Sequence, residues 1–157
     1  MTTPAAHDGL RLDPILMSYA SWPKRAAAYI LDGFILGIGL AAALIVAAVA
    51  GGHREDGVFP VVAWVYYLTA PAVYTTYFHG TTGRTPGKRL LGLRVADARD
   101  GTPIGFARAL VRQVSTFAMW TLFALPGIVD GLWPFFDERR RALHDLLVRS
   151  VVIDERD

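Results

Sequence analysis

One carboxylate lies inside a long apolar run. Residues 24–40 read KRAAAYILDGFILGIGL, and Asp32 is the only charged residue in Ala26–Ala50. An aspartate at the centre of a membrane-spanning helix costs roughly 2.5–3.5 kcal/mol on insertion scales. Such a residue therefore faces a cavity or a partner rather than lipid. Asp32 marks the first position where the chain could do chemistry.

Arg25 is the nearest candidate partner of Asp32. The two residues are two helical turns apart and share one face. Helical side chains lean toward the N-terminus, however, so Arg25 leans away from Asp32 and a direct bond between them is not expected. We expect both to meet other polar groups on a common face. The alternative is that Arg25 anchors the helix at the membrane interface and Asp32 is a neutral, hydrogen-bonded packing residue.

Two short motifs resemble known sites without meeting their requirements. The loop Gly80–Arg89 contains Gly87-Lys88, but a nucleotide-binding loop needs wider spacing between its glycines and Ser or Thr after the lysine. A structural turn or a lipid-headgroup contact is favoured instead. His144-Asp145 supplies two metal-ligand types, yet the remaining histidines are too dispersed to complete a site. They are His7, His53 and His79.

No enzyme chemistry is indicated elsewhere. No nucleophile lies beside a base, and the chain has no cysteine, which excludes disulfides and thiolate metal sites. We therefore predict a non-enzyme without cofactor or metal. Asp130 precedes Gly131-Leu132-Trp133-Pro134, where it is expected to line the return of the third apolar segment or to cap a half-helix.

Three apolar runs must position these residues. The mean hydropathy is +0.33 and 53% of the 157 residues are hydrophobic. About 20 apolar residues suffice to cross a bilayer as a helix, which predicts spans near residues 26–50, 58–78 and 114–136. The fold class expected is an all-α integral membrane protein. Residues 1–21 form an N-terminal arm, residues 22–153 the membrane domain and residues 154–157 a tail.

Basic residues flank the apolar runs. Loops rich in Lys and Arg stay in the cytoplasm, so the N-terminus and His79–Arg112 are predicted cytoplasmic. The same distribution accounts for the pI of about 9.2 without nucleic acid as a partner. The Ala-, Gly- and Arg-rich composition indicates a bacterial chain, and we expect a multi-pass protein of the inner (plasma) membrane.

The third apolar run is interrupted by Leu125-Pro126-Gly127. Proline and glycine there allow either one kinked span or a re-entrant hairpin of two half-helices. Residues 90–97 and 148–154 both alternate as strands do. They can pair only if they lie on the same side of the membrane, where we expect them to be short cytoplasmic strands; this pairing favours the hairpin.

Several stretches together resemble the RDD family of membrane proteins, named for one arginine and two aspartates. Trp22–Asp32 is similar to the family's opening, Thr85–Val95 and Gly101–Arg112 to its middle loop, and Arg141–Val152 to its last motif. The resemblance assigns the three named positions to Arg25, Asp32 and Asp145, with Asp137 as the alternative for the last. The secondary candidates for functional residues are His144, Asp130, Asp137, Arg112 and Lys88. Residues 147–150 depart from the family's usual small-residue and Thr turn.

The resemblance implies transport of an ion or small solute. For that role we expect Arg25, Asp32 and Asp145 to form a buried charged constellation near the cytoplasmic side, in which Asp32 binds a cation or proton and Arg25 favours its charged form. Three segments enclose little of a pathway, so a homo-oligomer or a membrane-protein partner is expected besides the lipid bilayer. The alternative is an accessory or assembly subunit of another membrane complex, in which the charges are structural. Gly33, Gly37 and Ala41, spaced by four, allow close helix contact in either case.

Overall fold

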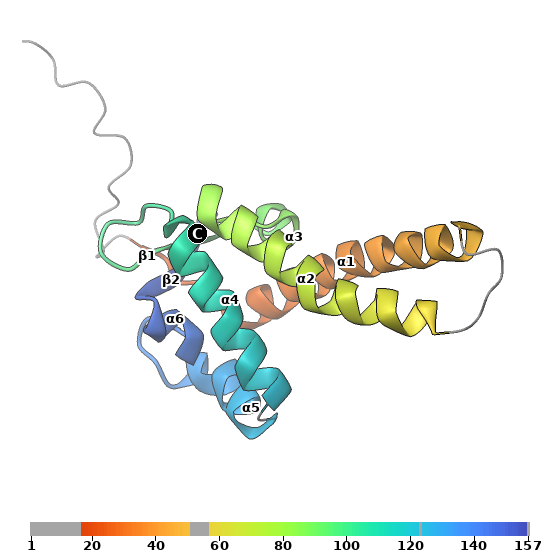
Figure 1. Ribbon diagram of the computed structural model, residues 1–157. Coiled ribbons are helices and arrows are strands. Elements are labelled where there is room, and N and C mark those ends of the chain that lie inside the picture. The colour runs from red at the N-terminus through yellow and green to blue at the C-terminus, as the bar shows by residue number, and fades with distance from the viewer. Residues whose placement is uncertain (1–16, 51–56, 123, 157) are drawn as a thin grey trace, which may run out of the picture.

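The structure is a computed structural model that describes residues 17–50, 57–122 and 124–156. The chain order is α1 (Trp22–Ala50), α2 (Val58–Thr81), α3 (Pro86–Leu90), β1 (Leu93–Asp97), α4 (Gly105–Leu122), α5 (Ala124–Leu132), a 3₁₀ turn (Trp133–Phe135), α6 (Leu143–Leu147) and β2 (Ser150–Asp154). In Figure 1, α1 and α2 pack together and extend away from a head that contains the other elements. Most of the predicted N-terminal arm and the turn between the first two spans, with His7 and His53, lie outside the described residues.

α1 and α2 carry their large apolar side chains outward. Phe34 and Ile38 of α1 and Trp64 of α2 are each more than 60% exposed. A helix of a soluble protein would bury such a face. Both helices are long and apolar enough to cross a membrane, with mean hydropathies of 2.5 and 1.3. The two predicted helices are therefore confirmed, although α1 begins earlier, at Trp22, and α2 continues to Thr81.

The third apolar run does not form one helix. α4 ends at Leu122, and α5 begins at Ala124 and packs back against α4. Pro126 lies in the first turn of α5, where its missing N–H breaks no helical hydrogen bond. Gly127 allows the close return, because a Cβ there would approach a Trp120 ring atom to 2.8 Å. Among the described helices, α1 and α2 alone have the length and hydropathy of a span, so a third span is not confirmed.

A small antiparallel sheet holds the head together. Val95 of β1 lies opposite Val152 of β2, and Leu93 lies opposite Asp154. The Ala20 N–H donates to the Val152 carbonyl at 2.9 Å, so the chain entering α1 lies along β2. The two predicted strands thus exist and pair, but both begin later than expected. Residues 86–90 form α3 instead, and Arg149 takes a positive φ of 52° in the turn before β2.

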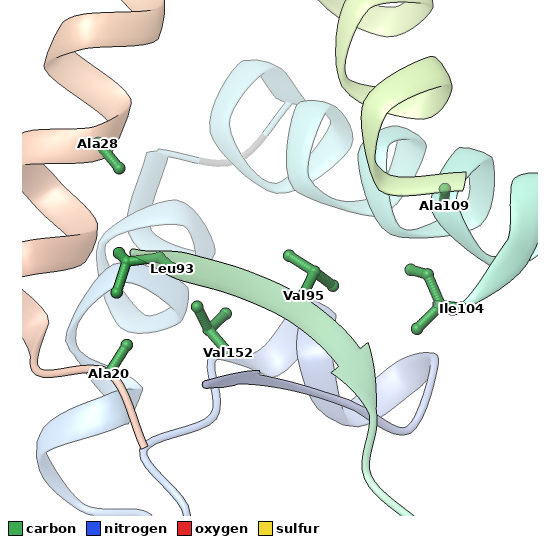
Figure 2. Close-up of a cluster of buried hydrophobic side chains, with 7 residues drawn as sticks. All are labelled: Ala20, Ala28, Leu93, Val95, Ile104, Ala109 and Val152. Carbon is green, nitrogen blue, oxygen red and sulfur yellow. The ribbon is translucent and has the colours of Figure 1, made fainter. Parts of the chain in front are cut away.

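The larger apolar cluster of the head lies on one face of this sheet, and a smaller one with Ala96, Val151 and Ile153 lies on the other. Leu93 and Val95 of β1 and Val152 of β2 are almost completely buried. Figure 2 shows them beside small or branched side chains from the first turns of α1 and α4 and from the residues just before these helices. These are Ala20, Ala28, Ile104 and Ala109. The core therefore fixes the first turns of α1 relative to α4, the two helices that carry Arg25 and Arg112.

Gly83 closes the turn between α2 and α3 against β1. Its carbonyl accepts a hydrogen bond from the Val95 N–H at 2.8 Å, and its φ is 73°. A Cβ at this position would lie 2.2 Å from the Val95 carbonyl oxygen. No side chain fits there without moving β1.

We predict that Gly83→Ala destabilises the protein more than Gly105→Ala does. Gly105 has a similar φ of 75°, but no atom lies within 4 Å of a Cβ placed on it. Both variants carry the left-handed penalty of roughly 1–2 kcal/mol, and Gly83→Ala adds a backbone clash. The measurement is the thermal unfolding midpoint of each variant purified in detergent. Equal shifts for the two variants would contradict the prediction.

Candidate functional site

Asp145 is the centre of a buried polar cluster in the head. Its side chain is completely buried at the start of α6. Oδ2 accepts from Arg25 Nη1 of α1 at 3.0 Å and from the Ala142 N–H at 3.2 Å. Oδ1 accepts from Arg112 Nε of α4 at 2.9 Å and from Ser150 Oγ of β2 at 3.1 Å. One carboxylate thus joins four segments of the chain.

The two arginines outweigh the cost of burying this charge. Burial by itself would raise the pKa of the Asp145 carboxyl, but the charges of Arg112 and Arg25 hold that pKa well below its usual range. Burial likewise disfavours the charged form of Arg112, and Asp145 more than offsets it, so the pKa of Arg112 is raised. Asp145 is therefore ionised at neutral pH. Its stabilisation is present above the ordinary carboxyl pKa and is lost only as pH falls through the lowered value.

Asp32 belongs to a second set of contacts, on the loop after α2. Its Oδ1 accepts from Tyr74 Oη at 2.8 Å and from the Gly87 N–H at 2.8 Å, and its Oδ2 accepts from Thr85 Oγ1 at 2.6 Å. Thr85 is also the N-cap of α3. Asp32 thus attaches the start of α3 to the first span. The structure places the Arg25 guanidinium on Asp145 and not on Asp32.

Gly87 makes this attachment possible. A Cβ there would lie 2.5 Å from the Ala28 carbonyl oxygen and 2.8 Å from Asp32 Oδ1. The Gly-Lys pair that only superficially resembled a nucleotide loop therefore has a packing reason for its glycine. Its lysine enters the polar cluster.

Lys88 is buried within electrostatic reach of both carboxylates, Asp32 and Asp145. Its Nζ lies 3.0 Å from His79 Nε2 and 4.9 Å from the centroid of the Tyr29 ring. The other ring nitrogen of His79 faces Arg112 Nη1 at 3.5 Å. Burial, and then the neighbouring Arg112 charge, lower the pKa of Lys88 to about 7. Protonation of this amine is thus balanced near neutral pH.

The His79 contacts depend on the charge of Lys88. Arginine can only donate, so His79 Nδ1 accepts from Arg112 when the ring proton is on Nε2. That Nε2 proton can be donated only to a neutral Lys88 amine. When Lys88 is charged it donates to Nε2, and the ring proton must move to Nδ1, opposite Arg112. Lys88 protonation and the His79 tautomer are therefore coupled.

His144 has a single consistent protonation state. Arg112 Nη2 lies 2.8 Å from Nε2, which must accept, so the ring is neutral with its proton on Nδ1. Nδ1 then donates to Asp130, 2.7 Å from Oδ2. Asp130 Oδ1 also accepts from the His144 N–H at 2.9 Å. Asp130, which lies on α5, thus caps the first turn of α6.

The structure brings most of the sequence-predicted residues together. Asp137 lies apart, in a part-buried pair with Arg141 at 2.8 Å. Within the described residues, no group of three His, Asp or Glu side chains is placed to hold a metal ion. Sequence reasoning missed the partners of the charges. These are His79, Tyr74, Thr85, Gly87 and Ser150.

We predict that Asp145→Asn is much more destabilising than Asp137→Asn. The first change leaves two buried guanidinium groups without a counter-charge, which costs about 3–5 kcal/mol for a broken buried pair. The second weakens a part-buried pair near the surface that leaves Arg141 in reach of solvent, which costs about 1 kcal/mol on the scale of exposed ion pairs. Thermal midpoints of the two variants in the same detergent check this. A comparable loss in both variants would show that Asp145 does not hold the head together.

Comparison with known proteins agrees with these motifs. The model of the RDD family matches residues 19–149. A proline-rich antigen of Mycobacterium leprae is 26% identical over 156 residues, covering 87% of this chain and 61% of the antigen. An uncharacterized protein of Haemophilus influenzae is 29% identical over 143 residues, covering 90% of this chain and 82% of the relative.

A proline-rich antigen homolog of Mycobacterium tuberculosis is 34% identical over 77 residues, covering 49% of this chain and 30% of that protein. The chain spans about three fifths of the leprosy-bacillus antigen and less of this homolog. No solved structure matches the chain significantly. The family match covers most of the chain and includes Arg25, Asp32 and Asp145, and the chain belongs to the RDD family.

Proposed function

We propose that this membrane protein has a transport-related role for an ion or small solute, in which Lys88 binds and releases a proton at the centre of the buried charges. The observation that carries the proposal is the contact between Lys88 Nζ and His79 Nε2 inside a cluster closed by Arg112. A group that changes charge in such a place alters the hydrogen bonds of its neighbours. Protonation can therefore be linked to opening of the cluster or to binding of an ion.

Asp32 is less suited to that role than its sequence position alone indicates. Both of its oxygens accept hydrogen bonds from within the chain, from Tyr74, Thr85 and Gly87. A cation would have to displace them. Asp32 instead fixes α3, and α3 carries Lys88 into the cluster. Lys88 is faced by charged or polar groups from each neighbouring helix, namely Arg25, Tyr29, Asp32, His79, Arg112 and Asp145.

Sheet pairing supports a re-entrant third segment. β1 and β2 are hydrogen-bonded neighbours, so the 98–149 segment begins and ends on one side of any membrane that α1 and α2 cross. α4 followed by the returning α5 fits a hairpin that enters and leaves on that side. With the basic residues of the head inside, this gives a cytoplasmic head and two full crossings in an inner membrane.

An accessory role is the second candidate. In this role the contacts of Asp32 and Asp145 are structural and fix the head to α1. α1 also exposes an open groove formed by Gly33, Gly37 and Ala41 with the flanking Ile30, Phe34 and Ile38. Small residues at this spacing suit close contact with a second helix. A stable heteromeric partner in mild detergent would favour this role, and a homo-oligomer would favour transport.

We predict that Lys88→Met abolishes proton movement in reconstituted vesicles that carry an imposed alkali-cation gradient and an internal pH dye. Lys24→Met is the matched control, because these are the two lysines of the chain and Lys24 is part-exposed and paired with Asp154. The rate of proton movement by the wild type should change across pH 7, which is close to the pKa of Lys88. Equal proton movement with Lys88→Met and wild type would exclude the proposed role.

We predict that Arg99→Cys and Leu147→Cys are both shielded from a membrane-impermeant maleimide in intact cells, and that Val58→Cys is labelled. All three positions are exposed, and the chain has no other cysteine. Arg99 precedes α4 and Leu147 follows α5, so the pair reports entry and exit of the third segment. Inside-out vesicles should reverse the pattern. If the reagent labels Leu147→Cys but not Arg99→Cys from outside, the third segment crosses the membrane.

A further inference from the structure

An open groove lies where the second span meets the head. One wall is the last turns of α2, the other is α3, and β1 contributes one side chain. Its volume is about 790 Å³, within the range of small-molecule sites. The 24 residues of α2 are about 36 Å long, against about 30 Å of hydrocarbon in a bilayer. The end of α2 therefore reaches the headgroups, and the groove lies at their level.

The groove carries an excess of positive charge. Arg84, Arg89 and Arg94 all line it. Arg84 Nη2 lies 2.6 Å from Glu155 Oε2, and Arg94 Nε lies 2.8 Å from Glu155 Oε1. Arg89 is exposed, and no acidic side chain in the described part of the chain is paired with it. Three arginines thus share one carboxylate, which leaves two positive charges at the level of the lipid phosphates.

The direction of Arg89 follows from the geometry of α3. Successive residues of a helix point about 100° apart, because one turn takes 3.6 residues. Lys88 is 2% exposed and belongs to the buried cluster, so its neighbour Arg89 is directed outward. The planar guanidinium carries parallel N–H groups that bind two oxygens of one phosphate. Arg89 is therefore the residue of the groove best placed to accept an anion from the membrane.

Apolar side chains make up the rest of the groove. Tyr77 and Leu90 are 57% and 62% exposed, and Phe78 lies beside Tyr77 with their ring centroids 5.3 Å apart. Tyrosine is enriched at membrane interfaces, where its ring meets both lipid chains and headgroups. A soluble anion gains nothing from such walls, whereas the acyl chains of a lipid cover them. The combination of arginines and exposed apolar groups favours a lipid.

We propose that this groove binds the phosphate of an anionic phospholipid from the leaflet on the side of the head. Arg89 is the main contact of the phosphate, and the acyl chains lie along Tyr77, Phe78 and Leu90. Glu155 is an internal competitor, because it already occupies Arg84 and Arg94. The site lies outside the buried cluster and goes beyond the proposed transport role, since binding requires no flux.

The test uses the full chain in mild detergent and two lipids with the same chains, dioctanoyl phosphatidylglycerol and dioctanoyl phosphatidylcholine. Native mass spectrometry counts the bound lipids. The first phosphatidylglycerol should bind at least fivefold more tightly than phosphatidylcholine, because it alone has a net negative charge. Equal binding would overturn the proposal.

Glycerol phosphate tests the apolar part of the site, because it offers a phosphate without acyl chains. It should bind at least tenfold more weakly than dioctanoyl phosphatidylglycerol, since each buried methylene contributes about 0.8 kcal/mol. Equal affinity of the two would identify a soluble anion as the occupant and would overturn the assignment to a lipid.

Arg89→Gln locates the phosphate. It should weaken phosphatidylglycerol about fivefold, as expected for one basic residue near an anionic membrane surface, and leave phosphatidylcholine unchanged. Arg99→Gln is the matched control, because Arg99 is an exposed arginine of the head that does not line the groove. An equal loss in both variants would indicate attraction to the overall charge and would overturn the site.

Glu155→Gln separates lipid binding from a structural role of the arginines. Removal of the carboxylate frees Arg84 and Arg94, so phosphatidylglycerol should bind about fivefold more tightly, even though the lipid-free protein loses two ion pairs and unfolds at a lower temperature. A purely structural cluster would show the lower midpoint without tighter binding, and that result would overturn the proposal. Because no transport is measured, failure of the vesicle assay would leave this test unaffected.

Discussion

The ion pairs of Asp145 with Arg25 and Arg112 are the constraint on which the head depends. Each charge alone would be expensive to bury, and together they satisfy one another only when α1, α4, α6 and β2 are in register. Arg25 and Asp145 are 120 residues apart in the sequence. Their ion pair therefore also brings distant parts of the chain together. The sheet and the apolar core beneath it supply the rigidity that holds this geometry.

Lys88 differs from these charges because its surroundings do not compensate it. The carboxylates Asp32 and Asp145 favour its charged form, but burial and two arginines oppose it, and the pKa falls to about 7. The amine is thus charged in the unfolded chain and only partly charged in the folded one at neutral pH. By linkage, stability should increase as pH rises from about 7 toward the ordinary lysine pKa. The cluster combines fixed charges, which organise the fold, with one that can vary.

Much of this fold could be predicted from the sequence because the membrane imposes simple patterns. Long apolar runs gave α1 and α2, and a carboxylate inside one of them indicated a buried polar site. The contacts of that carboxylate could not be predicted in the same way. Asp32 meets Thr85 and Gly87 through a tertiary turn that depends on Gly83 and β1. His79 reads as an ordinary residue at a helix end until Lys88 and Arg112 are placed beside it.

α4 has the polarity of a helix that faces lipid rather than of a helix in a soluble domain. α4 directs Arg108 and Arg112 toward β2 and α6, while Phe106, Leu110 and Val114 face outward, each about half exposed. A soluble helix shows the opposite arrangement. In a bilayer, burying an apolar side chain against another helix gains no hydrophobic free energy over leaving it in lipid. Buried polar contacts therefore contribute a larger share of the free energy that holds the helices together.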